Sequence, residues 1–386
     1  MHQVFRVLAV LAIITLSPVI GLSKKAPGKN AKHYNALGLQ DIKKGQYDQA
    51  IRDLNKALKL KSDYAVAYNN RGYAYYSKRL FDKALADYNQ AIKLNTMFAV
   101  AYSNRGLNYL AQGKFDKALE DYNTAIKLNP QLAVAYNYRG LVYFLQKDYD
   151  KAMTDFNKAI KINPKLALAY NNQGYIYYLL GSTDKAISDF NKALSLNPKL
   201  IFPYNNRGLA YYDKGDLSKA LADYNQTIKL NPKYAGAYNK RGLILYDQKD
   251  YNKAIADYNK AIQLRPGNPI TWNNRGLAYF QKKSYSRALS DFNKAIKLDP
   301  KYANAYNNRG LTYLHKKDYN KAIADFDKAV QLNPDLAVAY NNRAHAYYQK
   351  KAYAQAREDV QRAQKLKFPV NQELTENLKK LSAKKK

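Results

Sequence analysis

The sequence repeats itself every 34 residues. From Ala31 to Val370 the pattern runs through ten units without a gap. Each unit, for example residues 99–132, holds two apolar-periodic stretches of helical length separated by a short turn containing Gly or Lys. A helix-turn-helix of this length cannot bury both of its faces alone, so the repeat predicts a solenoid in which each unit covers the next.

Small and aromatic residues recur at fixed places within the unit, counted from its first residue. Position 8 is Gly in nine units and position 20 is Ala in all ten, which lets two helices approach closely. Position 4 is aromatic throughout, with Trp272 the only Trp, and position 24 is Tyr or Phe in eight units. Pro at position 32 in seven units ends the second helix. These residues predict the packing between helices.

This aromatic-Gly-Tyr-Ala-aromatic-Ala-Pro spacing resembles the tetratricopeptide repeat family over ten consecutive units. The resemblance implies an all-α fold, a right-handed α-solenoid superhelix of ten helix-turn-helix repeats. After the repeats, residues 371–386 place Leu374, Leu378 and Leu381 on one helical face, which predicts a C-terminal capping helix and a basic tail. The expected repeats are 31–64, 65–98, 99–132, 133–166, 167–200, 201–234, 235–268, 269–302, 303–336 and 337–370.

The N-terminal residues predict export. Residues 1–23 contain Arg6, an apolar stretch from Val7 to Leu16 and small residues before Lys24, the pattern of a signal peptide, with 24–30 as a linker. The lysines that follow the apolar stretch run against the usual charge bias. We expect a periplasmic or secreted protein with no transmembrane segment after signal removal, because no later stretch is apolar for long enough.

In the tetratricopeptide family, positions 2, 5, 6, 9, 12 and 13 of the first helix line a concave groove that binds ligand. Here positions 5 and 6 are mostly Asn, and an amide can both donate to and accept from a peptide backbone. The alternative is that these asparagines are solvated polar residues near the helix start. The predicted groove residues are Asn70, Asn104, Asn137, Asn171, Asn172, Asn205, Asn206, Asn239, Asn273, Asn274, Asn307, Asn308, Asn341, Asn342, Tyr178, Tyr212 and Tyr246.

A second polar pattern is predicted to be structural. Arg at position 7 recurs with Asp at position 23, which suggests a buried or half-buried ion pair between helices. Leu37 and Gln173 replace the Arg while Asp53 and Asp189 remain. Those two carboxylates need other partners, and a Lys at position 19 or 26 lies within helical reach.

The chain carries 64 Lys and Arg against 30 Asp and Glu, a formal charge of +34. Most of the excess lies at positions 19, 26, 29 and 33, on the second helix and the segment that follows it, on the expected convex side. Such a surface could bind anionic polymer, membrane or nucleic acid, or be only a solvated face. Nucleic acid is not the expected partner, because Lys-rich helix surfaces are more often only solvated, and the predicted leader peptide argues further against it.

Catalytic and metal-binding patterns are absent from the sequence. There is no Cys, and the four histidines, among them His315 and His345, have no carboxylate beside them in the pattern. We expect no metal, no cofactor and no enzyme activity. The sequence predicts a non-catalytic scaffold that binds a protein or peptide segment in its groove, with a targeting subunit of an enzyme complex as an alternative. No oligomeric state follows from these patterns.

Overall fold

The computed structural model describes residues 30–370 and 372–383, and the expected signal peptide lies outside those residues. Every regular element in this part of the chain is an α-helix, and no strand occurs in it. The predicted all-α solenoid of ten repeats is confirmed. A final helix, α22 (Gln372–Ala383), follows the last repeat.

Each repeat contributes two helices that keep the sequence period. The first helices are α2 (Ala31–Lys43), α4 (Ala65–Ser77), α6 (Ala99–Ala111), α8 (Ala133–Leu145), α10 (Ala167–Leu179), α12 (Ile201–Asp213), α14 (Ala235–Asp247), α16 (Pro269–Gln281), α18 (Ala303–His315) and α20 (Ala337–Gln349). The second helices are α3 (Tyr47–Leu60), α5 (Phe81–Leu94), α7 (Phe115–Leu128), α9 (Tyr149–Ile162), α11 (Thr183–Leu196), α13 (Leu217–Leu230), α15 (Tyr251–Leu264), α17 (Tyr285–Leu298), α19 (Tyr319–Leu332) and α21 (Tyr353–Lys365).

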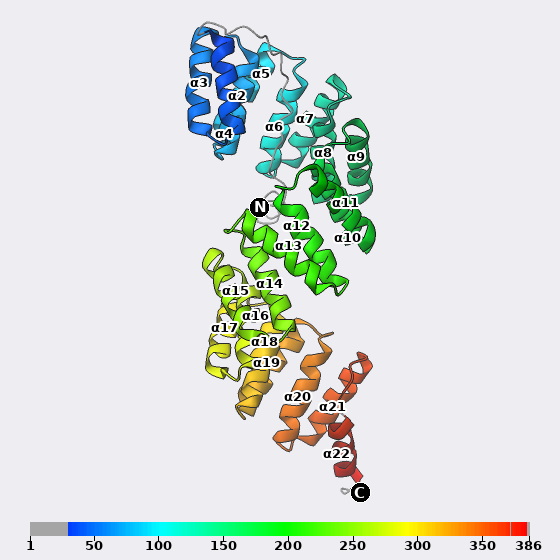
Figure 1. Cartoon of the computed structure of the whole chain (residues 1–386). Helices are drawn as coiled ribbons and strands as arrows, with labels where there is room; N and C mark the ends of the chain where they lie inside the picture. Colours follow the sequence, from blue (N-terminus) through cyan, green and yellow to red (C-terminus); the bar gives the residue numbers. More distant parts are fainter. Residues whose placement is uncertain (1–29, 371, 384–386) are drawn as a thin grey trace. The chain divides into compact units, whose positions relative to one another are not determined.

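The repeats form two compact units, Met1–Ala210 and Tyr211–Lys386, and each is described by itself. Within each unit the two helices of a repeat pack against each other, and the second helix packs against the first helix of the next repeat (Figure 1). The first helices of adjacent repeats also touch, as α4 and α6 do. Each helix therefore buries side chains against the helix before it and the helix after it.

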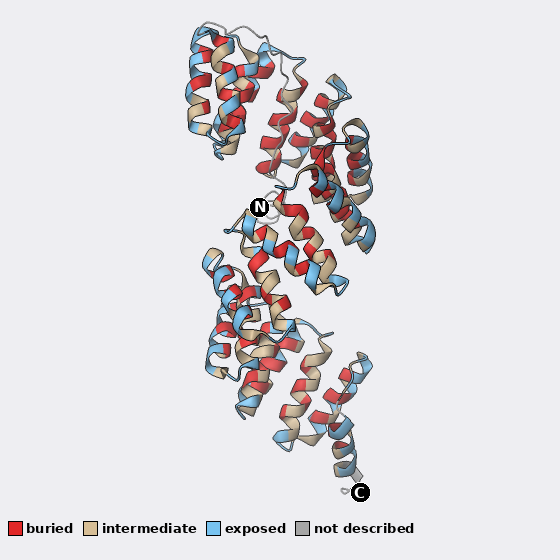
Figure 2. Ribbon diagram, in the orientation of Figure 1, coloured by how far each residue is buried: buried red, intermediate tan, exposed pale blue. Residues whose placement is uncertain are grey.

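The Gly at position 8 permits the close packing inside a repeat. A Cβ built on Gly140 would lie 2.8 Å from the Phe156 ring and 3.1 Å from the carbonyl oxygen of Ala152. Ala152, at position 20, and Phe156, at position 24, are both fully buried. Figure 2 shows the same alternation of buried and exposed residues along the other helix pairs. The small and aromatic positions of the sequence therefore form the core.

Two turns connect the helices. The turn within a repeat places position 15 at positive φ, occupied by Gly in four repeats and by Lys or Arg in six. The turn between repeats begins at position 31, where the side chain of Asn129 accepts a hydrogen bond of 3.0 Å from the backbone N–H of Gln131. The following Pro cannot continue the helix.

The last repeat is covered by α22. Leu374 and Leu378 are buried and pack with Val360 of α21. Across residues 30–370 and 372–383, no helix combines the length and the apolar character that crossing a membrane requires.

Candidate functional site

The predicted asparagines form a hydrogen-bonded ladder that links neighbouring repeats. The Asn172 side chain donates to Asn137 of the preceding repeat (3.0 Å) and accepts from its chain neighbour Asn171 (3.1 Å). Asn206 of the next repeat then donates to Asn171 (3.2 Å). Position 6 thus donates back to position 5 of the repeat before it. We call these linked side chains the Asn ladder.

Most asparagines of the Asn ladder are buried, whereas amides that bind a ligand directly would need to be exposed. Nine predicted groove residues are buried, namely Asn70, Asn104, Asn137, Asn171, Asn172, Asn206, Asn273, Asn307 and Asn342. The half-buried ones are Asn205, Asn239, Asn274, Asn308, Asn341, Tyr178, Tyr212 and Tyr246. The buried asparagines are therefore not solvated polar residues, and their first role in the structure is to join repeats.

Each ladder bond uses only part of an amide. A side-chain amide has two N–H donors and two acceptor lone pairs, so one ladder contact in each direction leaves one donor and one lone pair. In a buried Asn these groups are shielded from a partner. The half-buried members, such as Asn205 and Asn308, can still present theirs.

The ladder breaks in two repeats where position 6 is not Asn. Tyr138 replaces Asn at position 6 of the fourth repeat, and the residue that it would have contacted is Ser103 rather than Asn. The Ser103 hydroxyl is buried without a hydrogen-bond partner. In the seventh repeat Lys240 replaces the Asn, and burial lowers the pKa of its half-buried ammonium, opposed by the charge of Asp213. These two repeats interrupt an otherwise regular row.

Positions 2, 5, 9, 12 and 13 lie within about 100° of one another around a helix, and we call this surface the first-helix face. Leu179 at position 13 is 44% exposed, and the adjoining Leu180 is 59% exposed. At position 2, Val66 is 40% and Ile270 is 50% exposed. The first-helix face therefore presents apolar side chains to solvent, which sequence analysis did not identify individually.

In the second compact unit the same face is more polar. The Tyr212 hydroxyl donates to Asp247 of the next repeat (2.6 Å), and the Gln281 amide donates to the Tyr246 hydroxyl (3.2 Å). Position 12 thus contacts position 13 of the following repeat. These bonds hold Tyr212 and Tyr246 in place, with their rings half-buried.

The recurring Arg at position 7 connects the two helices of its own repeat and also contacts the preceding repeat. The Arg139 guanidinium donates two hydrogen bonds to Asp155 (2.8 and 2.7 Å) and one to Asn123 of the preceding repeat (2.7 Å). Hydrogen bonding to Asp155 raises the pKa of Arg139. The bidentate geometry explains why Arg, and not Lys, occupies position 7. We call this arrangement the Arg clamp.

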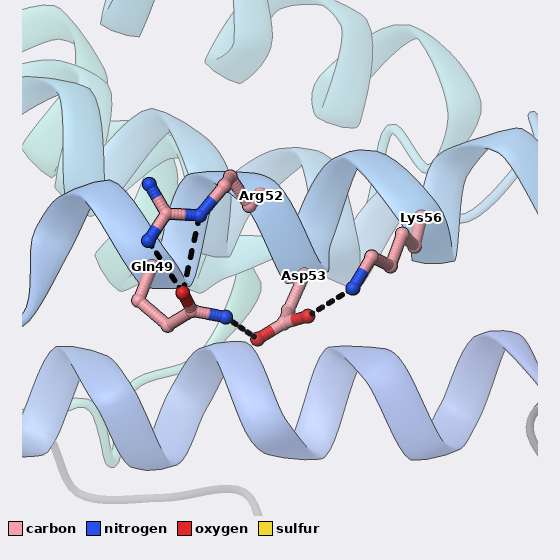
Figure 3. Close-up of polar contacts among 4 residues, drawn as sticks. All are labelled: Gln49, Arg52, Asp53 and Lys56. Carbon is pink, nitrogen blue, oxygen red and sulfur yellow. Dashed lines mark hydrogen bonds and ion pairs between the residues drawn. The ribbon is translucent and has the colours of Figure 1, made fainter.

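The two repeats without the Arg differ from each other. In the first repeat Asp53 accepts hydrogen bonds from Gln49 (2.7 Å) and Lys56 (3.1 Å), as Figure 3 shows. Lys56 is at position 26, so the prediction of a helical Lys partner is confirmed there. In the fifth repeat it is wrong: one carboxylate oxygen of Asp189 is buried without a partner, and burial raises the pKa of Asp189 to about 6.

The abundant tyrosines pack around these Arg residues. The Arg105 guanidinium lies 5.4 Å from the ring centroid of Tyr102 and 6.0 Å from that of Tyr109, on the same helix. Both distances fit cation–π contacts. Tyr at positions 4 and 11 therefore stabilises the Arg clamp, which accounts for a large share of the 38 Tyr.

His315 and His345 lie among packed side chains. The His315 ring lies 5.0 Å from Phe280 and 6.0 Å from Tyr285, and burial lowers the pKa of His345. Among the residues that the structure describes, no three His, Asp or Glu side chains gather in a geometry that could hold a metal ion.

Comparison with known families agrees with the period and the helix pairing. Profiles described as TPR repeat match residues 30–78, 106–147, 208–249, 242–283 and 276–317. Profiles described as tetratricopeptide repeat match residues 65–96, 133–166, 167–200, 303–336 and 337–368. The chain belongs to the tetratricopeptide repeat family. No curated protein matches its sequence.

Solved structures share the fold of this tetratricopeptide repeat protein. The APC/C hetero-tetramer Cut9–Hcn1 is similar over 89% of this chain and 80% of that chain, with 18% identity and a TM-score of 0.59. A tetratricopeptide repeat protein from Parabacteroides merdae is 25% identical over 65% of this chain and 99% of its own, with a TM-score of 0.48. The first likeness supports the solenoid fold alone.

Proposed function

We propose that this chain is a non-catalytic scaffold that binds a protein or peptide segment on its first-helix face. Membership of the tetratricopeptide repeat family supports a protein-interaction scaffold in general. The choice of face rests on one observation, the exposure of apolar side chains there, such as Ile270 at 50% and Leu179 at 44%. An apolar side chain held in water on a rigid helix gains free energy when a partner covers it.

The remaining polar groups of this face would orient the partner. Half-buried amides such as Asn205 retain a donor and an acceptor, and each hydrogen bond to a partner backbone contributes about 0.5–1.5 kcal/mol net. The buried members of the Asn ladder hold these amides in fixed positions. Because little conformational entropy is lost, a preformed row of weak contacts adds affinity.

A pull-down with matched substitutions tests this function. Leu179→Glu removes an exposed apolar side chain from the first-helix face, and Leu60→Glu makes the same change at a 57% exposed residue at the end of α3. We expect the Leu179 variant to lose a partner that wild type and the Leu60 variant retain in high salt. Loss in the Leu60 variant alone would place binding on the second helices and refute the proposal.

We also propose that the scaffold works in a bacterial cell envelope, because residues 1–23 have the pattern of a signal peptide. Cell fractionation followed by N-terminal sequencing tests this. A mature chain in the envelope fraction that begins near Lys24 would support export. An intact N-terminus in the cytoplasmic fraction would contradict it.

A further inference from the structure

Three consecutive turns of the second compact unit carry a pair of lysines each. The pairs occupy positions 14 and 15 of the eighth, ninth and tenth repeats, and all six side chains are exposed: Lys282, Lys283, Lys316, Lys317, Lys350 and Lys351. Adjacent turns lie on the same edge, because Lys350 donates to Asn320 at the start of the preceding second helix (2.5 Å) and Lys282 contacts Asn252 in the same way. We call this surface the turn edge.

The second lysine of each pair occupies a backbone conformation that favours Gly. Lys283, Lys317 and Lys351 have φ of 57°, 61° and 62°, in the left-handed region. Four other repeats place Gly there, among them Gly113 and Gly215. With Lys249 of the seventh repeat (φ 63°), the chain therefore carries a positive charge in four repeats in a row at a position where Gly would be less strained.

The acidic residue that neutralises the edge elsewhere is missing from the later repeats. Position 18, in the first turn of the second helix, is Asp in each of the first five repeats: Asp48, Asp82, Asp116, Asp150 and Asp184. In the first compact unit Lys78 forms an ion pair with Asp48. From the sixth repeat onward position 18 is Ser, Asn or Ala: Ser218, Asn252, Ser286, Asn320 and Ala354.

This replacement gives up two favourable interactions. An Asp in the first turn stabilises the helix through its dipole, and it would also pair with the Lys of the following turn. Lys282 and Lys350 instead contact the neutral amides of Asn252 and Asn320. Two carboxylates, Asp250 and Asp318, lie at the starts of the helices that carry Asn252 and Asn320, and they are already paired with Lys253 (2.7 Å) and Lys321 (2.8 Å). The turn edge therefore keeps most of its positive charge.

We propose that the turn edge binds the surface of an anionic lipid bilayer. Lysines in a row on one edge can approach a planar layer of negatively charged headgroups together, each adding to the attraction. Within the described part of the chain, no large exposed apolar residue lies on this edge to anchor a protein partner. The adjoining Tyr285 and Tyr353 rings pack against Phe280 and Tyr348, so these two rings do not stand open for stacking on nucleic-acid bases.

The test restores the acidic pattern of the early repeats without disturbing the core. The triple variant Asn252→Asp, Ser286→Asp and Asn320→Asp changes exposed residues, and the helix dipole favours each new carboxylate. A control triple, Gln226→Glu, Gln263→Glu and Gln331→Glu, adds the same charge on the second helices away from the turns. Circular dichroism checks that both variants fold.

Co-sedimentation of the full chain with vesicles of equal parts phosphatidylcholine and phosphatidylglycerol measures binding, with pure phosphatidylcholine as the neutral vesicle. We expect wild type to bind only the anionic vesicle, and the edge triple to bind about a hundredfold more weakly, since each charge near the surface is worth about fivefold. The control triple should bind within about threefold of wild type.

Three results would overturn the proposal. The first is wild type that leaves the anionic vesicles unbound. The second is equal weakening of binding by the edge and control triples, which would indicate a general effect of net charge. The third is tighter binding to poly-glutamate or duplex DNA than to the vesicles. If the edge triple lost that binding, the partner of the turn edge would be an anionic polymer and not a lipid bilayer. None of these results bears on the first-helix face, so the scaffold function is tested separately.

Discussion

Gln173→Arg should stabilise the fifth repeat by completing its Arg clamp. Gln173 already donates to Asn157 (2.6 Å), the contact that Arg139 makes with Asn123 one repeat earlier. What the fifth repeat lacks is the pair of charged hydrogen bonds to Asp189, one of whose oxygens is buried and unpartnered. The introduced guanidinium would donate hydrogen bonds to Asp189 and Asn157, as Arg139 does to Asp155 and Asn123.

The magnitude follows from the Asp189 pKa of about 6 in the folded chain. Relative to an unfolded pKa of about 3.9, ionisation at pH 7 would cost about 2.8 kcal/mol for a fully buried group. Because Asp189 is partly solvated, we discount this to about 1–2 kcal/mol. Its folded pKa is raised, so the cost is absent below about pH 4 and grows as the pH rises to about 6. The variant should therefore gain about 2 kcal/mol at pH 7 and less at pH 4.5.

Native-state hydrogen exchange of the α10 and α11 amides is the appropriate assay, because repeat arrays need not unfold in a single step. Arg139→Gln is the matched control, since it should create in the fourth repeat the defect that the fifth repeat has. A gain for Gln173→Arg that is absent at pH 7, or equal at both pH values, would refute the role assigned to Asp189.

Three further substitutions test the packing. Asn172→Ala should lower the free energy of unfolding by about 2–4 kcal/mol in urea titrations, because it leaves the buried side-chain oxygen of Asn137 and the buried N–H of Asn171 without their hydrogen-bond partner. An unchanged free energy of unfolding would mean that the Asn ladder does not join repeats. Tyr122→Phe should raise the melting temperature by the equivalent of about 1 kcal/mol, since its hydroxyl is buried without a partner; a lower melting temperature would reveal a hidden partner. Lys317→Gly should stabilise by up to about 1 kcal/mol in the same melts by relieving a left-handed Lys, and a loss would contradict that strain.

The fold was predictable because each helix boundary is repeated ten times in the sequence. Gly140 and Phe156 already indicated a close approach of two helices, and Lys56 was within helical reach of Asp53. Such contacts lie within one helix or one repeat, so the period alone locates them.

The site was harder to predict because its contacts join different repeats. Asn172 contacts a residue 35 positions earlier, one repeat plus one residue, and the mutual burial of two amides depends on how repeats stack. The amide chemistry was recognised, but its first partner is another Asn. The exposure of Leu179 likewise depends on packing, since the corresponding position 13 in the third repeat is the buried Ala111.

Site-specific photo-crosslinking tests the central claim most directly. A photoreactive phenylalanine would replace exposed Leu179 on α10 or exposed Lys158 on the second helix α9 in the full chain, followed by mass spectrometry of the adducts. The scaffold account predicts that one identified protein crosslinks at residue 179 and not at residue 158, including in high salt. A partner that crosslinks only at residue 158 would contradict binding on the first-helix face.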